Sequence, residues 1–93
     1  TVQMKIDSED DINLGWKIDG IYETGIRMTI VNNEPSQYMI NIYTTTGKRV
    51  RTEDVSVNGQ QTIYLNFKTT DLIYLINVNN GVTSETRKVV FIR

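Results

Sequence analysis

The sequence predicts an all-β, antiparallel β-sandwich of seven or eight strands, and three observations support this prediction. Isoleucine, valine and threonine make up 33 of the 93 residues, and these β-branched residues favour pleated, half-buried surfaces. Alanine, the best helix former, is absent. Short runs of alternating apolar and polar residues are separated by Gly and Asn turns about every 8 to 12 residues, which is typical of a sandwich. We therefore also expect Greek-key connections.

Two strands are expected in the N-terminal part of the chain. Residues 2–6 alternate between apolar and polar and precede an acidic loop at residues 7–11. Residues 12–18 alternate again, with Trp16 on the apolar side, and stop at the turn dipeptide Asp19-Gly20. The second strand should therefore bury an aromatic residue.

Two further strands are expected at residues 26–30 and 38–42, where apolar residues again occupy every second position. Between them lies a loop at residues 32–36 that contains Pro35, the only proline. Proline has no backbone N–H to donate to a neighbouring strand, and a loop does not require this donor. The strand at 38–42 should end at the corner formed by residues 44–47.

The second half of the chain predicts the remaining strands. Residues 50–57 form one bent strand or two short ones before Asn58-Gly59, a hairpin-turn dipeptide, and residues 63–67 follow with a period of two. Residues 72–78 and 86–93 form the last strand pair, joined by a turn at residues 79–81 that supplies positive backbone angles.

The expected core follows from the parity of each alternating run. Tyr74 begins a late strand, as the tyrosine-corner residue of Greek-key sandwiches does, so its hydroxyl should bond back to the backbone. The predicted core residues are Ile12, Trp16, Ile30, Ile42, Leu65, Tyr74, Ile76 and Val90.

Length and composition predict a single domain, residues 1–93, that is not an enzyme and holds no cofactor. The chain has neither cysteine nor histidine, which removes thiol nucleophiles, thiolate zinc sites and the commonest general base. A nucleophilic serine would therefore lack its usual partner. The serines concerned are Ser8, Ser36, Ser56 and Ser84.

Charge is unevenly placed along the chain. Residues 1–46 hold 3 basic and 7 acidic groups (−4), and residues 47–93 hold 7 basic and 4 acidic groups (+3). Interleaved strands should mix these charges in space. The net charge of −1 and the scattered cations argue against nucleic-acid binding. Five of the ten cations show this scatter in the second half of the chain: Arg49, Arg51, Arg87, Lys88 and Arg93.

No membrane span is expected, because the longest apolar run, residues 72–76, is far shorter than the ~20 residues that a spanning helix needs. No cleavable signal is recognisable, so an exported form would be a mature or excised domain.

The acidic loop has oxygen side chains at every second position, as a calcium loop does. The helix-flanked calcium loop also needs glycine at its sixth position and a carboxylate at its twelfth, where this chain has Ile12 and Ile18. We expect a solvated loop without metal and leave a weak ion site as the alternative. The residues concerned are Asp7, Glu9, Asp11 and Asn13.

Aromatic residues could form a platform for sugar rings. Trp16 and Tyr38 share the parity of their apolar neighbours and are expected in the core. Tyr43 and Tyr64 have the opposite parity and are expected to be exposed, as ordinary surface or as a glycan site; Tyr22 completes the aromatic set.

Three elements carry a resemblance to a known family. Residues 42–50 have the form Ile-Tyr-x-x-x-Gly-Lys-x-Val, residues 63–67 form a short apolar strand, and residues 87–90 form a basic-aliphatic ending. Over residues 26–93 the chain resembles the immunoglobulin-like C-terminal domains of exported Bacteroidetes proteins. These include the type IX secretion sorting domain and small Bacteroides domains of unknown function. The resemblance implies an immunoglobulin-like sandwich that is exported to the periplasm, the cell surface or the medium.

The chain departs from the sorting-domain pattern at two places. Residues 19–25 replace the opening Pro-Asn-Pro element, and residues 69–73 replace the Pro-x-Gly before the tyrosine strand. We therefore expect first a non-enzymatic, monomeric structural or protein-interaction module that binds an unknown protein or cell-surface partner. The alternatives are a C-terminal sorting or anchoring domain for type IX secretion and a carbohydrate-binding accessory module. If the last strand pair lies at a sheet edge, Arg87, Lys88 and Arg93 would guard it against uncontrolled pairing.

Overall fold

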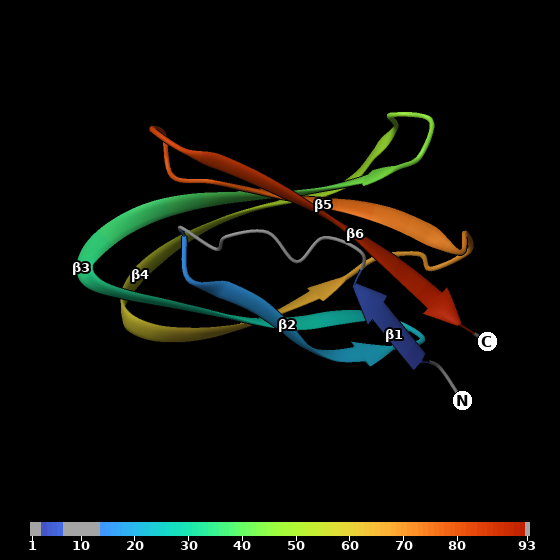
Figure 1. The fold of residues 1–93 in the computed structure, drawn as a ribbon, viewed down its shortest axis with the longest axis horizontal. Coiled ribbons are helices and arrows are strands. Elements are labelled where there is room, and N and C mark those ends of the chain that lie inside the picture. The colour runs from blue at the N-terminus through green and yellow to red at the C-terminus, as the bar shows by residue number, and fades with distance from the viewer. Residues whose placement is uncertain (1–2, 7–13, 93) are drawn as a thin grey trace.

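The computed structural model describes residues 3–6 and 14–92, which form one antiparallel sheet of six strands (Figure 1). The predicted all-β, antiparallel class is confirmed. The strands pair in the order β1-β6-β5-β3-β2, and β4 runs along the other edge of β3. Their bounds are β1 Gln3–Ile6, β2 Trp16–Tyr22, β3 Gly25–Thr44, β4 Arg49–Asn66, β5 Ile73–Asn79 and β6 Ser84–Ile92.

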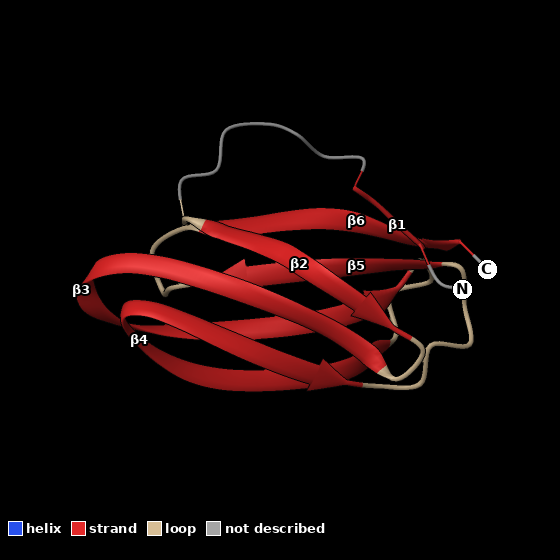
Figure 2. Cartoon of the chain, turned by 90° about the horizontal axis from the view of Figure 1, so that it is seen from below, coloured by secondary structure: helices blue, strands red, loops and turns tan. Residues whose placement is uncertain are grey.

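The long strands β3 and β4 bend together and give the sheet two layers. In Figure 1 the first half of β3 lies with β2, and its second half lies with β5 and β6. Figure 2 shows the same two layers joined through the bends of β3 and β4. The pairing register shifts at the bend, between Asn32 and Ser36, and Gly59 lies opposite on β4 with a φ of 86°. This bulge and the left-handed glycine let both strands turn without breaking their pairing.

The predicted number of strands is wrong for the described residues, which form six strands rather than seven or eight. The segments 26–30 and 38–42 are both parts of β3, and 50–57 and most of 63–67 are parts of β4. The predicted loop at 32–36 and the predicted turn Asn58-Gly59 therefore lie inside strands. An Asn-Gly pair supplies a positive φ, and a bend uses that angle as readily as a turn does.

The predicted turn at Asp19-Gly20 is also wrong, because β2 continues to Tyr22 with a register shift between Ile18 and Gly20. The Asp19 carboxylate accepts hydrogen bonds from Arg27 Nε at 2.9 Å and Thr29 Oγ1 at 2.7 Å, both on β3. Asp19 therefore faces its partner strand across a bulge instead of closing a turn.

The C-terminal hairpin of β5 and β6 follows the sequence prediction closely. Gly81 has a φ of 92°, and Asn80 N donates to Thr83 O at 3.1 Å in the turn between the two strands. The Asn79 and Asn80 side-chain oxygens accept three more backbone N–H groups in the same turn. Because these contacts are local, the sequence predicts this hairpin without knowledge of the rest of the fold.

Most of the predicted core is confirmed: Trp16, Ile30, Ile42, Leu65, Tyr74 and Ile76 are each at most 1% exposed. Ile12 lies outside the described residues. Val90 is wrong, because it is only partly buried while Val89 and Phe91 are fully buried. The inward residue Tyr74 pairs with Val89 in the β5–β6 register, and this pairing turns Val90 toward the other face.

The described part of the chain contains only strands, turns and loops, and no helix in it is long and apolar enough to cross a membrane.

Candidate functional site

The C-terminal hairpin is the candidate site because it carries the tyrosine strand and the basic-aliphatic ending singled out in the sequence. β5 pairs with β3 on one side and with β6 on the other. β1 pairs with β6 over Val89 to Ile92. Neither β5 nor this half of β6 is therefore a free sheet edge. The proposed guarding role of the basic residues requires a free edge, and these two segments do not provide one.

Tyr74 fixes the loop that leads into β5, as the tyrosine-corner comparison predicts. Its hydroxyl donates to Lys68 O at 2.9 Å and accepts from Asp71 N at 2.9 Å. Its ring packs edge-on against Phe67, with centroids 5.0 Å apart, and against Phe91, with centroids 5.4 Å apart. The tyrosine therefore anchors the start of the hairpin both by aromatic packing and by two backbone hydrogen bonds.

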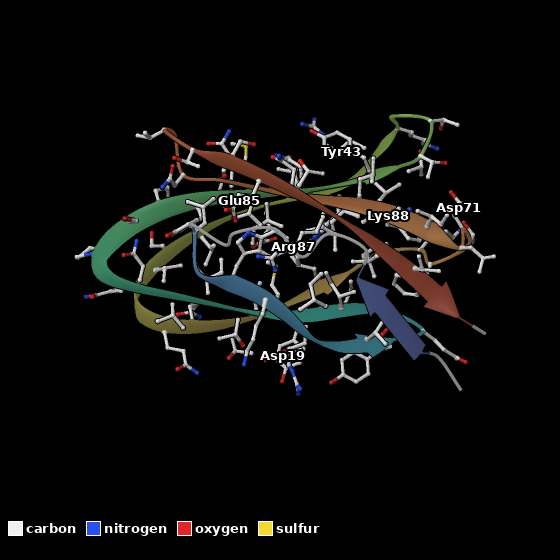
Figure 3. All side chains as sticks on the ribbon, viewed as in Figure 1. Asp19, Tyr43, Asp71, Glu85, Arg87 and Lys88 are labelled. Carbon is white, nitrogen blue, oxygen red and sulfur yellow. The ribbon has the colours of Figure 1, made fainter. Side chains whose placement is uncertain are left out.

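Arg87 is buried between the two layers instead of lying on the surface (Figure 3). Its guanidinium carbon lies 3.8 Å from the centroid of the Trp16 ring, and Nη1 donates to Trp16 O at 2.8 Å. Burial lowers the pKa of Arg87, while the charge of Glu85 opposes this shift. A guarding role for Arg87 is therefore wrong, since the side chain joins β6 to β2 inside the domain.

The contact between β6 and β2 is completed by Glu85, whose Oε1 accepts a hydrogen bond from Trp16 Nε1 at 2.8 Å. Among the described residues, Nη2 of Arg87 has no hydrogen-bond partner. The sequence does not predict this cluster, because residues 89–92 are apolar at both parities and do not show that Arg87 shares the buried face of Val89 and Phe91.

The outward face of the hairpin carries a polar row that continues onto β3 and β4. Thr52 Oγ1 donates to Asn41 Oδ1 at 2.7 Å, and Asn77 Nδ2 donates to Thr86 Oγ1 at 3.0 Å. Asn41 and Asn77 are register partners, so these pairs form one row across four strands. Lys88 is in register with Leu75, one row further along, and it follows the buried Arg87, so it lies on the outward face of the strand. Arg93 lies outside the described residues.

The aromatic candidates do not form one platform. Trp16 and Tyr38 are buried, as predicted, and Tyr64 is 62% exposed, as predicted. Tyr43 is only half-buried on the outward face of β3. Tyr64 is in register with Arg27, which binds Asp19, and Figure 3 shows Asp19 and Tyr43 on opposite outer sides of the molecule.

The remaining exposed aromatic of the set is Tyr22, which is 42% exposed on β2.

The serine candidates that the structure describes each pair with an amide side chain: Ser36 accepts from Asn32, Ser56 donates to Gln37 and Ser84 accepts from Asn77. Ser8 and the proposed calcium-loop residues Asp7, Glu9, Asp11 and Asn13 lie outside the described residues. Within residues 3–6 and 14–92, no three acidic residues come close enough to hold a metal ion.

Most of the chain matches a known protein family. The family of secretion system C-terminal sorting domains matches residues 23–93, which hold the whole of β3, β4, β5 and β6. No curated protein and no solved structure matches the chain. The match includes Tyr74 and the basic-aliphatic ending but not β1 or β2, whose Trp16 contacts Arg87. The chain belongs to the family of secretion system C-terminal sorting domains and is part of an exported protein.

Proposed function

We propose that this domain is a C-terminal sorting domain that directs its parent protein through the type IX secretion system. The observation that carries the proposal is the family match over residues 23–93. This match favours sorting over the interaction module of unknown ligand that the sequence analysis expected first. The domain acts without catalysis, through surfaces that the secretion machinery contacts.

The loop before β5 explains how the chain keeps the family's hairpin without the Pro-x-Gly element. The Tyr74 hydroxyl holds Lys68 and Asp71, Thr69 Oγ1 donates to Glu23 O, and Phe91 N donates to Leu72 O at 2.7 Å. Proline and glycine fix a loop by restricting or permitting backbone angles, whereas here hydrogen bonds hold it. The missing motif therefore does not count against the sorting role.

Within this proposal the domain is an immunoglobulin-like sandwich with Greek-key connections, in which the two halves of β3 and of β4 serve as separate strands of the two layers. Its outward hairpin face, with Lys88 beside the polar row, is the surface that a partner protein contacts. Arg87 supports that face from inside, because it holds β6 against β2.

A reporter fusion tests the proposal. A fluorescent protein with its own inner-membrane export signal carries this domain at its C-terminus in a type IX-competent host. We expect the reporter at the cell surface or in the medium, and in the periplasm when the domain is omitted or the host lacks the secretion system. A reporter that stays in the periplasm while its domain resists protease digestion would show that the fold alone is not a sorting signal.

Two matched lysine variants identify the recognised face. Lys88→Gln lies on the hairpin inside the family match, and Lys17→Gln lies on β2 outside it. We expect Lys88→Gln to reduce export and Lys17→Gln to leave it unchanged. Equal export of both variants would exclude Lys88 from the recognised surface.

A further inference from the structure

A pocket of about 610 Å³ opens at one end of the sheet, between the β3–β4 turn and the loop from β4 to β5. Lys48 lies in the turn, and Arg49 is the first residue of β4. Lys68 and Asp71 lie in the loop. The pocket shares Lys68, Asp71 and Tyr74 with the loop that anchors the start of the hairpin.

The turn that forms one wall is closed by hydrogen bonds. Thr44 N donates to Lys48 O at 2.8 Å, Gly47 N donates to Thr44 O at 3.0 Å, and Lys48 N donates to Thr44 Oγ1 at 3.2 Å. Gly47 has a φ of 92°, which a residue with a Cβ rarely adopts. The turn therefore holds the backbone of Lys48 in one conformation.

The opposite wall is equally fixed. The buried Tyr74 hydroxyl bridges Lys68 O and Asp71 N, and Thr69 Oγ1 donates to Glu23 O between them. The backbones that carry Lys48 and Lys68 are thus set before any ligand arrives. A fixed backbone removes the cost of ordering these two segments when a ligand binds, and only the lysine side chains then have to be ordered.

The charges around the pocket are unbalanced. Lys48, Arg49 and Lys68 carry three positive charges, and Asp71 carries one negative charge, which leaves +2. Within the part of the chain that the structure describes, no ion pair involves any of these three cations. A concave site with a net positive charge attracts anionic ligands.

We propose that this pocket binds a phosphate ester of a hydroxyl-bearing molecule. A phosphate monoester carries about −1.5 to −2 charge at neutral pH and so matches the pocket, whereas a carboxylate would leave half of the charge unbalanced. Lys48, Arg49 and Lys68 hold the phosphate. Thr46, Thr70 and the Asp71 carboxylate line the same space and offer hydrogen-bond partners to the hydroxyl groups of the ligand.

Titration of the isotope-labelled domain tests the proposal, with backbone amide shifts as the readout. The probes are glucose 1-phosphate, glucose and gluconate in phosphate-free buffer of low salt. We expect glucose 1-phosphate to shift residues 44–50 and 68–71, to bind more weakly as salt rises, and to bind at least tenfold more tightly than glucose or gluconate. Equal binding of gluconate, or shifts spread over all lysines, would overturn the proposal.

Charge variants give the matched control. The double variant Lys48→Gln/Lys68→Gln should weaken binding of glucose 1-phosphate at least tenfold, and Lys17→Gln, an exposed lysine on β2, should leave it unchanged. Thermal unfolding by circular dichroism checks that each variant is folded. A similar loss in Lys17→Gln would mean that net charge rather than the pocket binds the ligand.

A vesicle arm distinguishes a lipid headgroup from a soluble ester. Co-sedimentation with vesicles that contain phosphatidylinositol 4-phosphate, whose headgroup carries a phosphate monoester and free hydroxyl groups, but not with phosphatidylcholine vesicles, that is lost in the double variant would assign the phosphate to a lipid. Binding of glucose 1-phosphate without co-sedimentation would assign it to a soluble molecule, and binding of neither would overturn the proposal. None of these measurements requires secretion, so they succeed or fail independently of the sorting role.

Discussion

The guanidinium of Arg87 lies over the ring of Trp16, 3.8 Å from its centroid, and donates to the Trp16 carbonyl from a position 71 residues later in the chain. This contact joins β6, near the C-terminal end of the fold, to β2, which precedes the family match. A cation over an aromatic ring contributes up to about 2 kcal/mol when both groups are desolvated. The two layers, which β3 and β4 already join, are thus also linked by a charged contact that packs against the apolar core.

Replacement of the tryptophan should nearly unfold the domain. Truncation of a buried aromatic to alanine typically costs about 3 to 5 kcal/mol, and a small domain has only about 5 to 15 kcal/mol of stability. Trp16→Ala also removes the ring that Arg87 covers. Urea denaturation measures the loss, with Tyr64→Ala, a change at an exposed aromatic, as the control. A loss below about 1 kcal/mol for Trp16→Ala would contradict its place in the core.

Two substitutions of Arg87 should distinguish how much its packing and how much its charge contribute to stability. Arg87→Ala removes the hydrogen bond to Trp16 O and the cation over the ring, and we expect it to cost about 2 to 4 kcal/mol. Arg87→Met fills much of the same volume and should cost less, because only the polar contacts are lost. Urea denaturation of the two variants shows which of them loses more free energy of unfolding. Arg87→Ala as stable as the parent protein would show that the contact contributes nothing.

Removal of one hydroxyl should loosen the loop before β5. Tyr74→Phe keeps the aromatic packing but leaves Lys68 O and Asp71 N without the tyrosine hydroxyl, at an expected cost of about 1 to 3 kcal/mol. Urea denaturation measures that cost, and hydrogen exchange at the Asp71 amide should become faster. Tyr43→Phe is the control, because that hydroxyl makes no hydrogen bond within the described part of the chain. Unchanged exchange at Asp71 would contradict the anchoring role.

Acid should weaken the contact between β2 and β3 through Asp19. Hydrogen bonds from Thr29 and then from Arg27 lower the pKa of Asp19 below its ordinary value of 3.8. A carboxyl whose pKa is lower in the folded state stabilises the fold above its unfolded pKa. That contribution disappears as the pH falls below 3.8 and through the folded pKa.

Urea denaturation from neutral pH to about pH 2 measures this effect in the parent protein and in Asp19→Asn. The parent protein should lose more stability than the variant in the acid range, and the two curves should approach each other below the folded pKa. Parallel curves over the whole range would mean that Asp19 has the same pKa in both states.

Local chemistry was enough to predict several elements. The β-branched composition and the period of two predict strands, and Asn79, Asn80 and Gly81 predict the last turn because their hydrogen bonds lie within a few residues. The buried parity of Trp16 and Tyr74 also follows from their immediate neighbours. The resemblance of residues 26–93 to a sorting domain, which the family match supports, rests on the same local patterns.

Contacts between distant segments decided the rest. Asn58-Gly59 forms a bend and not a turn because β3 continues to pair with β4 on both sides of it. The run from Val89 to Ile92 is apolar at both parities, so only the register with β5 determines which of these side chains enter the core. The sequence by itself therefore determined where strands form, because alternation and turn chemistry are local. Only the tertiary structure decided where strands bend and which face of β6 is buried, because strand pairing acts between residues far apart in the chain.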